Sequence, residues 1–396
     1  MKNIFSLAAL AATAMLAGCA GAPAGPSGAW TEKQTVYFDL LGVNEAWIMA
    51  GGKGVTIGII DGGFDYDHPG LKGRIRQVYS YPGAHHPTDM RTLAHGTFIA
   101  SIIGAVPVDG GMSGLCPDSE MLGADMGIIE HWRTRYRVKY FAEHPAATAG
   151  EYEKSLEDKK SELEEFDKKW LQYASSSVAG GLRALTDSGA KVIAMSLMLA
   201  GLEGDDLKQL EDAMAYAAAH DVIMIVGAGN NADYIKDYPG PNAATLVTGC
   251  SVGGAVWTQT TNQKGKNYTQ GTNYGPDLDV LAPCMEVVVA NPHEPAWYKV
   301  SDGPRGPYDV KFTGEYEVYP AGGTSISVAF AAGLAALVRS ANPALTAEQT
   351  AEIIRKTADD FAPPGRDDAN GWGRVNFYRA VSLAAQTAPA PAPAAQ

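Results

Sequence analysis

Residues 322–338, GGTSISVAFAAGLAALV, combine two glycines with a long run of small and apolar side chains. The glycines permit a tight turn and a close approach of the backbone to a ligand. The run carries no charge before Arg339, which predicts a helix buried on nearly all sides. Ser325 therefore stands where a loop enters a buried helix. This stretch alone favours an N-cap role for Ser325, but it also permits a nucleophile whose oxyanion faces the positive end of the helix.

The composition is that of a compact, loop-rich protein. The chain has 396 residues, of which 46% are hydrophobic and 19% charged, and it contains 45 glycines. This length can bury a large core in one or two domains. The formal net charge of -13 argues against DNA or RNA as the main partner, because nucleic-acid binding requires clustered Lys and Arg to neutralise phosphates.

The N-terminus has the features of an export signal. A lysine at position 2 precedes a short apolar stretch and then LAGC at 16–19, which resembles a bacterial lipobox. We expect residues 1–18 to be a lipoprotein signal peptide, with lipidation of Cys19 after cleavage; the alternative is an ordinary secretory signal. The apolar stretch is too short to span a bilayer. The mature protein is then lipid-anchored in the cell envelope, on the periplasmic side of the outer membrane in a Gram-negative host, because Ala20 rather than Asp follows the cysteine.

The two ends of the chain frame one domain. Residues 19–33 are rich in Ala, Gly and Pro in their first half, which is typical of a flexible tether. Residues 34–383 are expected to form the folded domain. Residues 384–396 repeat Ala and Pro and are expected to be disordered.

Three cysteines remain when Cys19 is set aside: Cys116, Cys250 and Cys284. Because their number is odd, at least one is unpaired, and no CxxC or metal-like spacing occurs. Buried free thiols are the simpler expectation. We expect no metal and no cofactor.

Short β-branched runs alternate with helical patterns through the domain. Strands are expected at 55–60, 121–125, 190–198, 221–226 and 246–253, helices at 43–49, 95–104, 178–188, 205–220, 324–338 and 345–358, and a β-rich region at 286–319. This alternation predicts a parallel sheet with right-handed crossovers. Asp61 follows the first strand, at the edge where open α/β sheets bind and react.

A charged segment interrupts the alternation. Residues 143–173 are rich in Glu, Lys and Asp, and charges of opposite sign lie three and four residues apart. We predict a long, mostly exposed helix, inserted at about 128–177. The simpler interpretation is a solvated structural helix; the alternative is a docking arm for protein, or a lid over a cleft.

Three polar residues stand beside or near glycine, each at the predicted end of a strand or start of a helix: Asp61, His95 and Ser325. Their order in the chain is that of the subtilisin catalytic triad. The sequence resembles the subtilisin-like serine peptidases from about residue 43 to about residue 380. The matching motifs are IIDGG at 59–63, HGT at 95–97, GN at 229–230 and GTS at 323–325.

The resemblance implies an α/β, subtilisin-like three-layer fold with a mostly parallel central sheet, and a serine endopeptidase that acts on proteins or peptides. Ser325 would attack the peptide carbonyl, His95 would take and return its proton, and Asp61 would hold the imidazole. Asn230 and the Ser325 backbone N–H would bind the oxyanion. The expected substrate-binding residues are Ser196, Leu197, Met198, Gly227, Ala228 and Gly229.

Ser196, Leu197 and Met198 would form an edge strand that pairs with an extended peptide. Met198 replaces the glycine that is usual beside the first specificity pocket, which predicts a narrowed pocket. The alternative function is a catalytically inactive relative that only binds protein. Because all three triad residues and Asn230 are present, the enzyme is favoured.

Overall fold

The structure is a computed structural model of the chain. It describes residues 29–81, 91–108, 111–126, 140, 143–144, 147–263, 266–292, 297–303, 306–311, 315–319, 323–361 and 363–388. The predicted signal peptide, Cys19, residues 19–28 of the tether and residues 389–396 of the tail lie outside these residues. The predicted boundaries of the tether and the tail are wrong by a few residues, because 29–33 begin a helix that ends at Leu41 and 384–386 end a helix that begins at Phe377.

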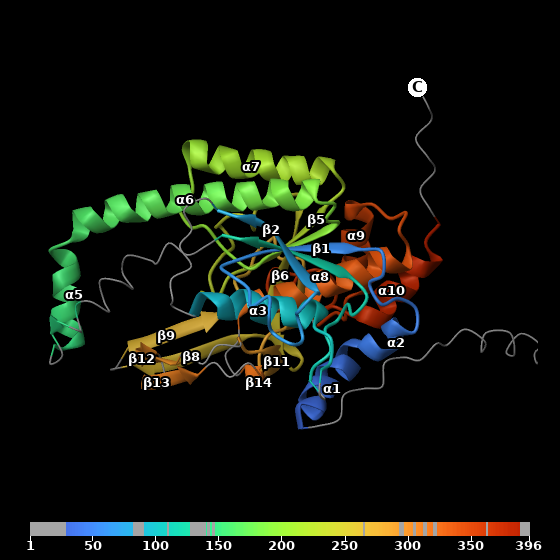
Figure 1. The fold of residues 1–396 in the computed structure, drawn as a ribbon, viewed down its shortest axis with the longest axis horizontal. Coiled ribbons are helices and arrows are strands. Elements are labelled where there is room, and N and C mark those ends of the chain that lie inside the picture. Colours follow the sequence, from blue (N-terminus) through green and yellow to red (C-terminus); the bar gives the residue numbers. More distant parts are fainter. Residues whose placement is uncertain are drawn as a thin grey trace, which may run out of the picture.

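A parallel sheet forms the centre of the molecule (Figure 1). Its strands are β1 (Thr56–Asp61), β2 (Ile75–Ser80), β3 (Glu120–Asp125), β4 (Val192–Met195), β5 (Ile223–Gly227), β6 (Thr245–Val252) and β10 (Val280–Pro283), in the order β10-β6-β5-β4-β1-β3-β2. All pairings along this path are parallel. The short β7 (Ala255–Val256) adds to β6 in antiparallel orientation. β4 and β5 are buried along their whole length, as expected for parallel strands covered on both faces.

Helices cover both faces of the sheet and create two hydrophobic cores. One face carries α1 (Ala29–Leu41), α2 (Val43–Trp47), α3 (Arg91–Gly104), α8 (Thr324–Ala341), α9 (Ala347–Thr357) and α10 (Phe377–Gln386). The other carries α6 (Lys160–Asp187) and α7 (Gly204–Ala219). The predicted three-layer α/β fold with a parallel sheet is therefore confirmed.

The helix that decides the fold, α8, lies at the centre of the first core. Among the described residues it is the one helix that is long and apolar enough to cross a membrane, and 83% of it is buried within the protein. Residues 328–338 are almost completely inaccessible to solvent. α8 is therefore a core helix, as the run of small and apolar side chains predicts.

Three two-stranded sheets lie outside the central sheet. They pair β8 (Thr258–Gln263) with β9 (Lys266–Gly271), β11 (Val287–Ala290) with β14 (Tyr316–Tyr319), and β12 (Trp297–Gly303) with β13 (Gly306–Lys311). The last two pairs confirm the β-rich region expected at 286–319. The β8–β9 hairpin was not predicted, because its Thr, Gln and Asn residues do not alternate with apolar ones.

The charged insertion differs from its prediction in two ways. It is divided into α5 (Ala149–Glu157) and α6, with a break at Asp158 and Lys159. α6 also continues without interruption into the helix predicted at 178–188, so the arm and the core helix are one element. The reason is that buried residues such as Val178 and Leu182 extend the helical pattern of the exposed half into the core.

The exposed half of α6 extends past the sheet. α6 has 28 residues, about 42 Å at 1.5 Å per residue, whereas the following strand β4 has 4 residues and spans about 13 Å. Ser175 Oγ donates a hydrogen bond to the Asp206 carbonyl at the start of α7. Trp170 and Leu171 still pack against the second core, so residues 160–169 reach about 15 Å beyond it, on the side where the strands end, and α5 continues from them (Figure 1). We call α5 and residues 160–169 the arm.

Candidate active site

Ser325 is the second residue of α8, and it does not cap the helix. The N-cap is Gly323, and no side chain forms a capping hydrogen bond. The Ser325 hydroxyl instead donates to the Ser196 carbonyl at 3.4 Å, and the Ser196 hydroxyl donates to the Ser325 carbonyl at 3.2 Å. The capping interpretation is therefore wrong. The hydroxyl faces the loop that follows β4, at the carboxyl edge of the sheet.

The sheet register brings Asp61 and the loop that contacts Ser325 to this edge. β1 pairs with β4 so that Ile60 lies opposite Met195, and the next residues along these two strands are Asp61 and Ser196. Neighbouring strands lie about 4.8 Å apart, and Ser196 is bonded to Ser325. Asp61 and Ser325 thus both lie near Ser196, although 264 positions separate them in the sequence.

Asp61 holds His95 by its carboxylate. Nδ1 of His95 lies 2.9 Å from Oδ1 and 2.8 Å from Oδ2 of Asp61. Because a carboxylate only accepts hydrogen bonds, Nδ1 carries the proton in this pair and Nε2 is the basic nitrogen of a neutral ring. Asp61 is buried, and its Oδ1 also accepts from the Gly62 N–H at 2.7 Å. The carboxylate is thus fixed before it orients the imidazole.

His95 lies inside α3 and not at its start, because the helix already begins at Arg91. Gly96 explains how the helix comes so close to the loop after β1. A Cβ at position 96 would lie 2.0 Å from the Gly63 carbonyl oxygen, so a larger residue would push α3 away. The glycine of the HGT motif therefore has a packing role that places His95 beside Asp61.

The pKa of His95 is raised above its ordinary value of 6.5. Burial by itself lowers this pKa, but the negative charge of Asp61 and the hydrogen bond to it both raise it, and together they prevail. The same interactions stabilise the imidazolium that forms when His95 acts as a base and takes a proton. The pair is thus suited to accept a proton, although in this structure the Ser325 hydroxyl donates to the Ser196 carbonyl and not to His95.

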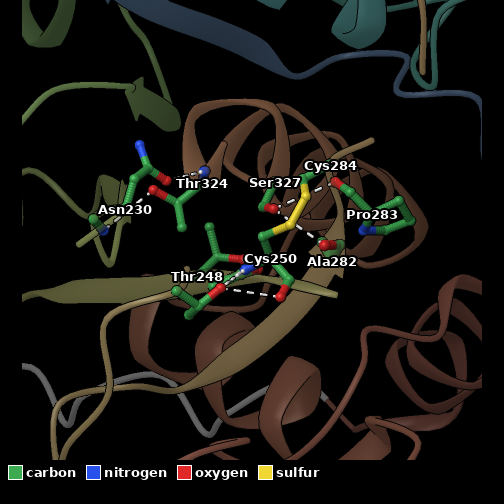
Figure 2. Close-up of a disulfide and its surroundings, with 11 residues drawn as sticks. Asn230, Thr248, Cys250, Ala282, Pro283, Cys284, Thr324 and Ser327 are labelled. Atoms are coloured by element: carbon green, nitrogen blue, oxygen red, sulfur yellow. Dashed lines mark hydrogen bonds between the residues drawn. A yellow bond between two sulfur atoms is a disulfide. The ribbon is translucent and has the colours of Figure 1, made fainter. Parts of the chain in front are cut away.

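Asn230 follows β5 and faces the first turn of α8 (Figure 2). Its Oδ1 accepts from the Thr324 N–H at 2.8 Å, and the Thr324 hydroxyl accepts from the Gly229 N–H at 3.1 Å. The amide oxygen is therefore engaged, which leaves Nδ2 as the donor for a ligand. A Cβ at Gly323 would lie 3.6 Å from Nδ2, in ordinary van der Waals contact, so Gly323 lies directly beside this donor.

The predicted substrate-binding residues divide into two groups. Ser196, Leu197 and Met198 follow β4, which ends at Met195, so they lie in a loop and not in the predicted strand. The other three are buried: Gly227, Ala228 and Gly229. A Cβ at Gly229 would lie 2.6 Å from the Met198 sulfur, so the Met198 side chain covers the glycine.

A disulfide lies next to this site, where free thiols were expected. Cys250 on β6 is bonded to Cys284, the residue after β10, so that expectation is wrong for these two cysteines. The two strands are paired neighbours, with Ala282 opposite Cys250. Sequence spacing could not reveal this, because the pairing of β6 with β10 depends on the whole sheet. Cys116 remains unpaired and buried, as the odd number of cysteines requires.

Sequence reasoning missed two further residues at the start of α8. The Ser327 hydroxyl donates to the carbonyls of Ala282 and Pro283, at 3.1 and 3.3 Å, directly before Cys284 (Figure 2). Thr324 joins α8 to Asn230, as described above. Both lie within the GTSIS motif, but their partners are distant in sequence and no spacing signal identifies them.

The described part of the chain contains no group of three or more His, Cys, Asp or Glu side chains that could hold a metal ion. A buried carboxylate, an imidazole and a hydroxyl at one sheet edge, with an amide donor opposite, can carry out acyl transfer.

Comparison with known proteins agrees with this chemistry. The model of the subtilase family, peptidase S8, matches residues 52–373. A thermophilic serine proteinase from Bacillus sp. (strain AK1) is 25% identical over 367 residues, which cover 90% of this chain and 70% of the relative. Thermitase from Thermoactinomyces vulgaris is 25% identical over 344 residues, which cover 85% and 92%.

Solved structures show the same fold. The MycP3 protease from the type VII (ESX-3) secretion system superposes with a TM-score of 0.61 at 21% sequence identity, covering 91% of this chain and 89% of that one. Fervidolysin from Fervidobacterium pennivorans superposes with a TM-score of 0.58 at 21% identity, covering 87% of this chain and 44% of that one.

Proposed function

The chain belongs to the subtilase family of serine proteases, and from that premise we propose that Ser325, His95 and Asp61 form its catalytic triad and cleave peptide bonds of proteins through an acyl-enzyme. The observation that carries this proposal is the double contact of the Asp61 carboxylate with His95 Nδ1, at 2.8 and 2.9 Å. It directs Nε2 away from Asp61 and makes it the base.

Acylation begins when His95 Nε2 removes the proton of Ser325 Oγ and the oxygen attacks the carbonyl carbon of the substrate. The hydroxyl first leaves the Ser196 carbonyl, to which it donates at 3.4 Å; catalytic hydrogen bonds often close only when substrate is bound. The imidazolium, stabilised by Asp61, then gives its proton to the leaving amine, and the peptide C–N bond breaks. Water repeats the sequence on the acyl-enzyme and restores the serine.

The oxyanion of each tetrahedral intermediate is bound by Asn230 Nδ2 and by the Ser325 backbone N–H. The hydrogen bond from the Thr324 N–H to Asn230 Oδ1, at 2.8 Å, supports this role, because it fixes the amide group and thereby orients Nδ2. A preorganised donor of this kind stabilises the transition state by roughly 3–4 kcal/mol. The positive end of α8 contributes to the same oxygen.

The substrate is an extended peptide with a small side chain before the cleaved bond. The loop of Ser196, Leu197 and Met198 would pair with its backbone by strand addition. The Met198 side chain lies against Gly229, where a Cβ would meet its sulfur at 2.6 Å, and it fills space that a glycine would leave open. The arm extends beyond the same edge of the sheet and would contact protein substrates outside the cleft.

We infer the location of the protein from its N-terminal sequence. The LAGC motif at 16–19 supports lipidation of Cys19 and attachment to the cell envelope, on the periplasmic side of the outer membrane if the host is Gram-negative. Metabolic labelling with a palmitate analogue would test this: the full-length chain should be labelled and a Cys19→Ala variant should not. Equal labelling of both would disprove lipidation at this residue.

A fluorophosphonate probe tests the catalytic proposal and separates it from an inactive, protein-binding relative. The probe should label the wild-type chain and not the Ser325→Ala variant. Ser340→Ala is a matched control, because Ser340 lies at the opposite end of α8 and donates to the Lys53 carbonyl. Labelling of Ser325→Ala, or failure of the folded wild type to react, would contradict the proposal.

A further inference from the structure

The loop that carries Asn230 has an unfavourable backbone and needs support from outside. Gly229 has a φ of 101° and Ala232 a φ of 51°. Glycine adopts such angles readily, but for an alanine the left-handed region costs free energy and persists only when neighbouring bonds hold it. The position of the oxyanion donor therefore depends on what binds residues 229–233.

Asn273 supplies part of this support from a single buried side chain, which is 2% exposed, and the Ala232 N–H itself donates to the Gly271 carbonyl at 2.9 Å. Its Oδ1 accepts from the backbone N–H of Asn231 at 2.9 Å and from that of Asp233 at 3.2 Å. These two N–H groups lie on either side of Ala232. One carbonyl oxygen thus holds both flanks of the strained residue.

The backbone around Asn273 holds the other side of Asn230. The Asn273 N–H donates to the Gly229 carbonyl at 2.9 Å, and the Gly271 N–H donates to the Asn230 carbonyl at 3.1 Å. Gly229 also provides room for the Asn273 side chain, since a Cβ at position 229 would lie 2.5 Å from Asn273 Nδ2. The bonds of Asn273 reach the residues directly before and directly after Asn230.

We propose that Asn273 is a positioning residue of the oxyanion hole: it fixes the backbone of residues 229–233 so that Asn230 Nδ2 meets the oxyanion. Thr324 orients the Asn230 side chain, and Asn273 orients its backbone. This inference rests on the proposed role of Asn230. It predicts a coupling between two residues that a purely structural role of Asn273 would not produce.

A double-mutant cycle on peptide hydrolysis tests the coupling. Asn230→Ala should lower kcat by roughly 10²- to 10³-fold. Asn273→Ala should lower kcat by roughly 10- to 100-fold with KM changed by less than about 3-fold, because only a transition-state interaction is weakened. In the Asn230→Ala background the same Asn273→Ala change should cost less than about 3-fold, since the donor that it positions is gone.

Asn342→Ala is the matched control. Asn342 is also an asparagine that holds backbone groups, because its Nδ2 donates to the Ala384 and Thr387 carbonyls and its Oδ1 accepts from Ala344 N–H. It lies at the far end of α8, so its loss should lower the melting temperature without changing kcat. If Asn273→Ala does not fold, the cycle is run with Asn273→Ser, whose shorter hydroxyl cannot hold both N–H groups.

The outcomes separate this inference from the proposed function. Equal losses of kcat from Asn273→Ala in both backgrounds, a loss confined to KM, or no loss at all would overturn the positioning role and leave the triad intact. A wild-type chain that hydrolyses no peptide and does not react with the fluorophosphonate would overturn the proposed function, and this inference with it.

Discussion

The helices α8 and α9 both begin with a hydroxyl residue near the N-cap, but they use it in opposite ways. In α9 the Thr346 hydroxyl accepts from the Gln349 N–H at 3.2 Å, and Gln349 Oε1 accepts from the Thr346 N–H at 2.9 Å. In this capping box, side chains of the helix start itself accept hydrogen bonds from its free backbone N–H groups. In α8 the hydroxyls of Thr324 and Ser325 bind the loops after β5 and β4 instead.

The difference shows how a helix start becomes a reactive site. A capped helix has little use for an external partner, because its own side chains occupy the free N–H groups. The N-cap of α8 is Gly323, which offers no capping side chain. Asn230 from a neighbouring loop takes the Thr324 N–H, and the rest of the positive end is available to an anion beside that loop. α8 is also buried almost all round, whereas α9 buries only one face. A core helix holds the reacting groups more rigidly than a surface helix.

The largest expected effect at the α8 end comes from Asp61→Asn. Hydrolysis requires neutral His95, so activity should rise with pH through the pKa of His95, which lies above 6.5. The variant loses the negative charge that raises this pKa, so its midpoint should move to lower pH, and kcat should fall by about 10⁴-fold. A pH profile of kcat/KM measures both changes.

The linked effect on stability has a defined sign. Because folding raises the pKa of His95, the stabilisation by Asp61 is fully present below about pH 6.5, the pKa of an unperturbed His, and is lost as the pH rises through the folded-state pKa. Thr346→Ala in α9 provides the comparison and should leave the activity profile unchanged. An unchanged midpoint in Asp61→Asn would show that the carboxylate does not control the imidazole.

The disulfide beside the α8 end should make the next contribution, this time to stability. Cys250 and Cys284 are 34 residues apart, and closing a loop of this length stabilises the folded state by about 3–4 kcal/mol through the entropy of the unfolded chain. Replacing both cysteines by alanine should therefore lower the free energy of unfolding by about this amount. Equilibrium unfolding in urea measures it.

Reduction of the wild type under the same conditions is the control for this prediction, and it should reproduce the loss without a change of sequence. A difference below about 1 kcal/mol would be too small for the loop-closure mechanism. It would show that the bonds of Ser327 to Ala282 and Pro283 hold the α8 end without the disulfide.

A smaller effect is expected on specificity. The Met198 side chain covers Gly229, and the Gly229 N–H donates a hydrogen bond to the Thr324 hydroxyl of α8. Met198→Gly should open this space and raise kcat/KM for a substrate with Phe before the cleaved bond, relative to Ala, by at least roughly 10-fold, the lower end of the discrimination that one methylene group in a pocket provides. Peptide pairs that differ only at this position measure the ratio. A wild type that already prefers Phe would contradict the narrowed pocket.

The sequence predicted the sheet, the core helix and the Asp–His pair, because each depends on a local pattern or a motif. IIDGG combines a buried strand with the turn that ends it, so it places Asp61 at the carboxyl edge. The errors concern contacts between distant segments. The disulfide depends on the pairing of β6 with β10. The hydrogen bonds of the Asn273 side chain likewise reach a loop that is 40 residues away in the sequence. No local pattern encodes such contacts.

Helix boundaries failed for a related reason. The apolar residues at helical spacing in 95–104 predict a helix that starts at His95, although α3 already begins at Arg91. Gly96 is needed for contact with the Gly63 carbonyl, so tertiary packing, and not the end of a helix, determines this residue. Ser325 was ambiguous in the same way, since capping and catalysis require the same residue type at nearly the same place.

The smallest expected effect tests the α9 side of the comparison. Thr346→Ala removes the capping box and should lower the free energy of unfolding by about 1 kcal/mol, with kcat and KM unchanged. Gln349→Ala removes the reciprocal bond and should cost less, because the Thr346 hydroxyl still caps the helix. Both are measured by urea unfolding and by peptide hydrolysis. A fall in kcat would mean that the start of α9 is coupled to the site through α8, so that the two helix ends do not act independently.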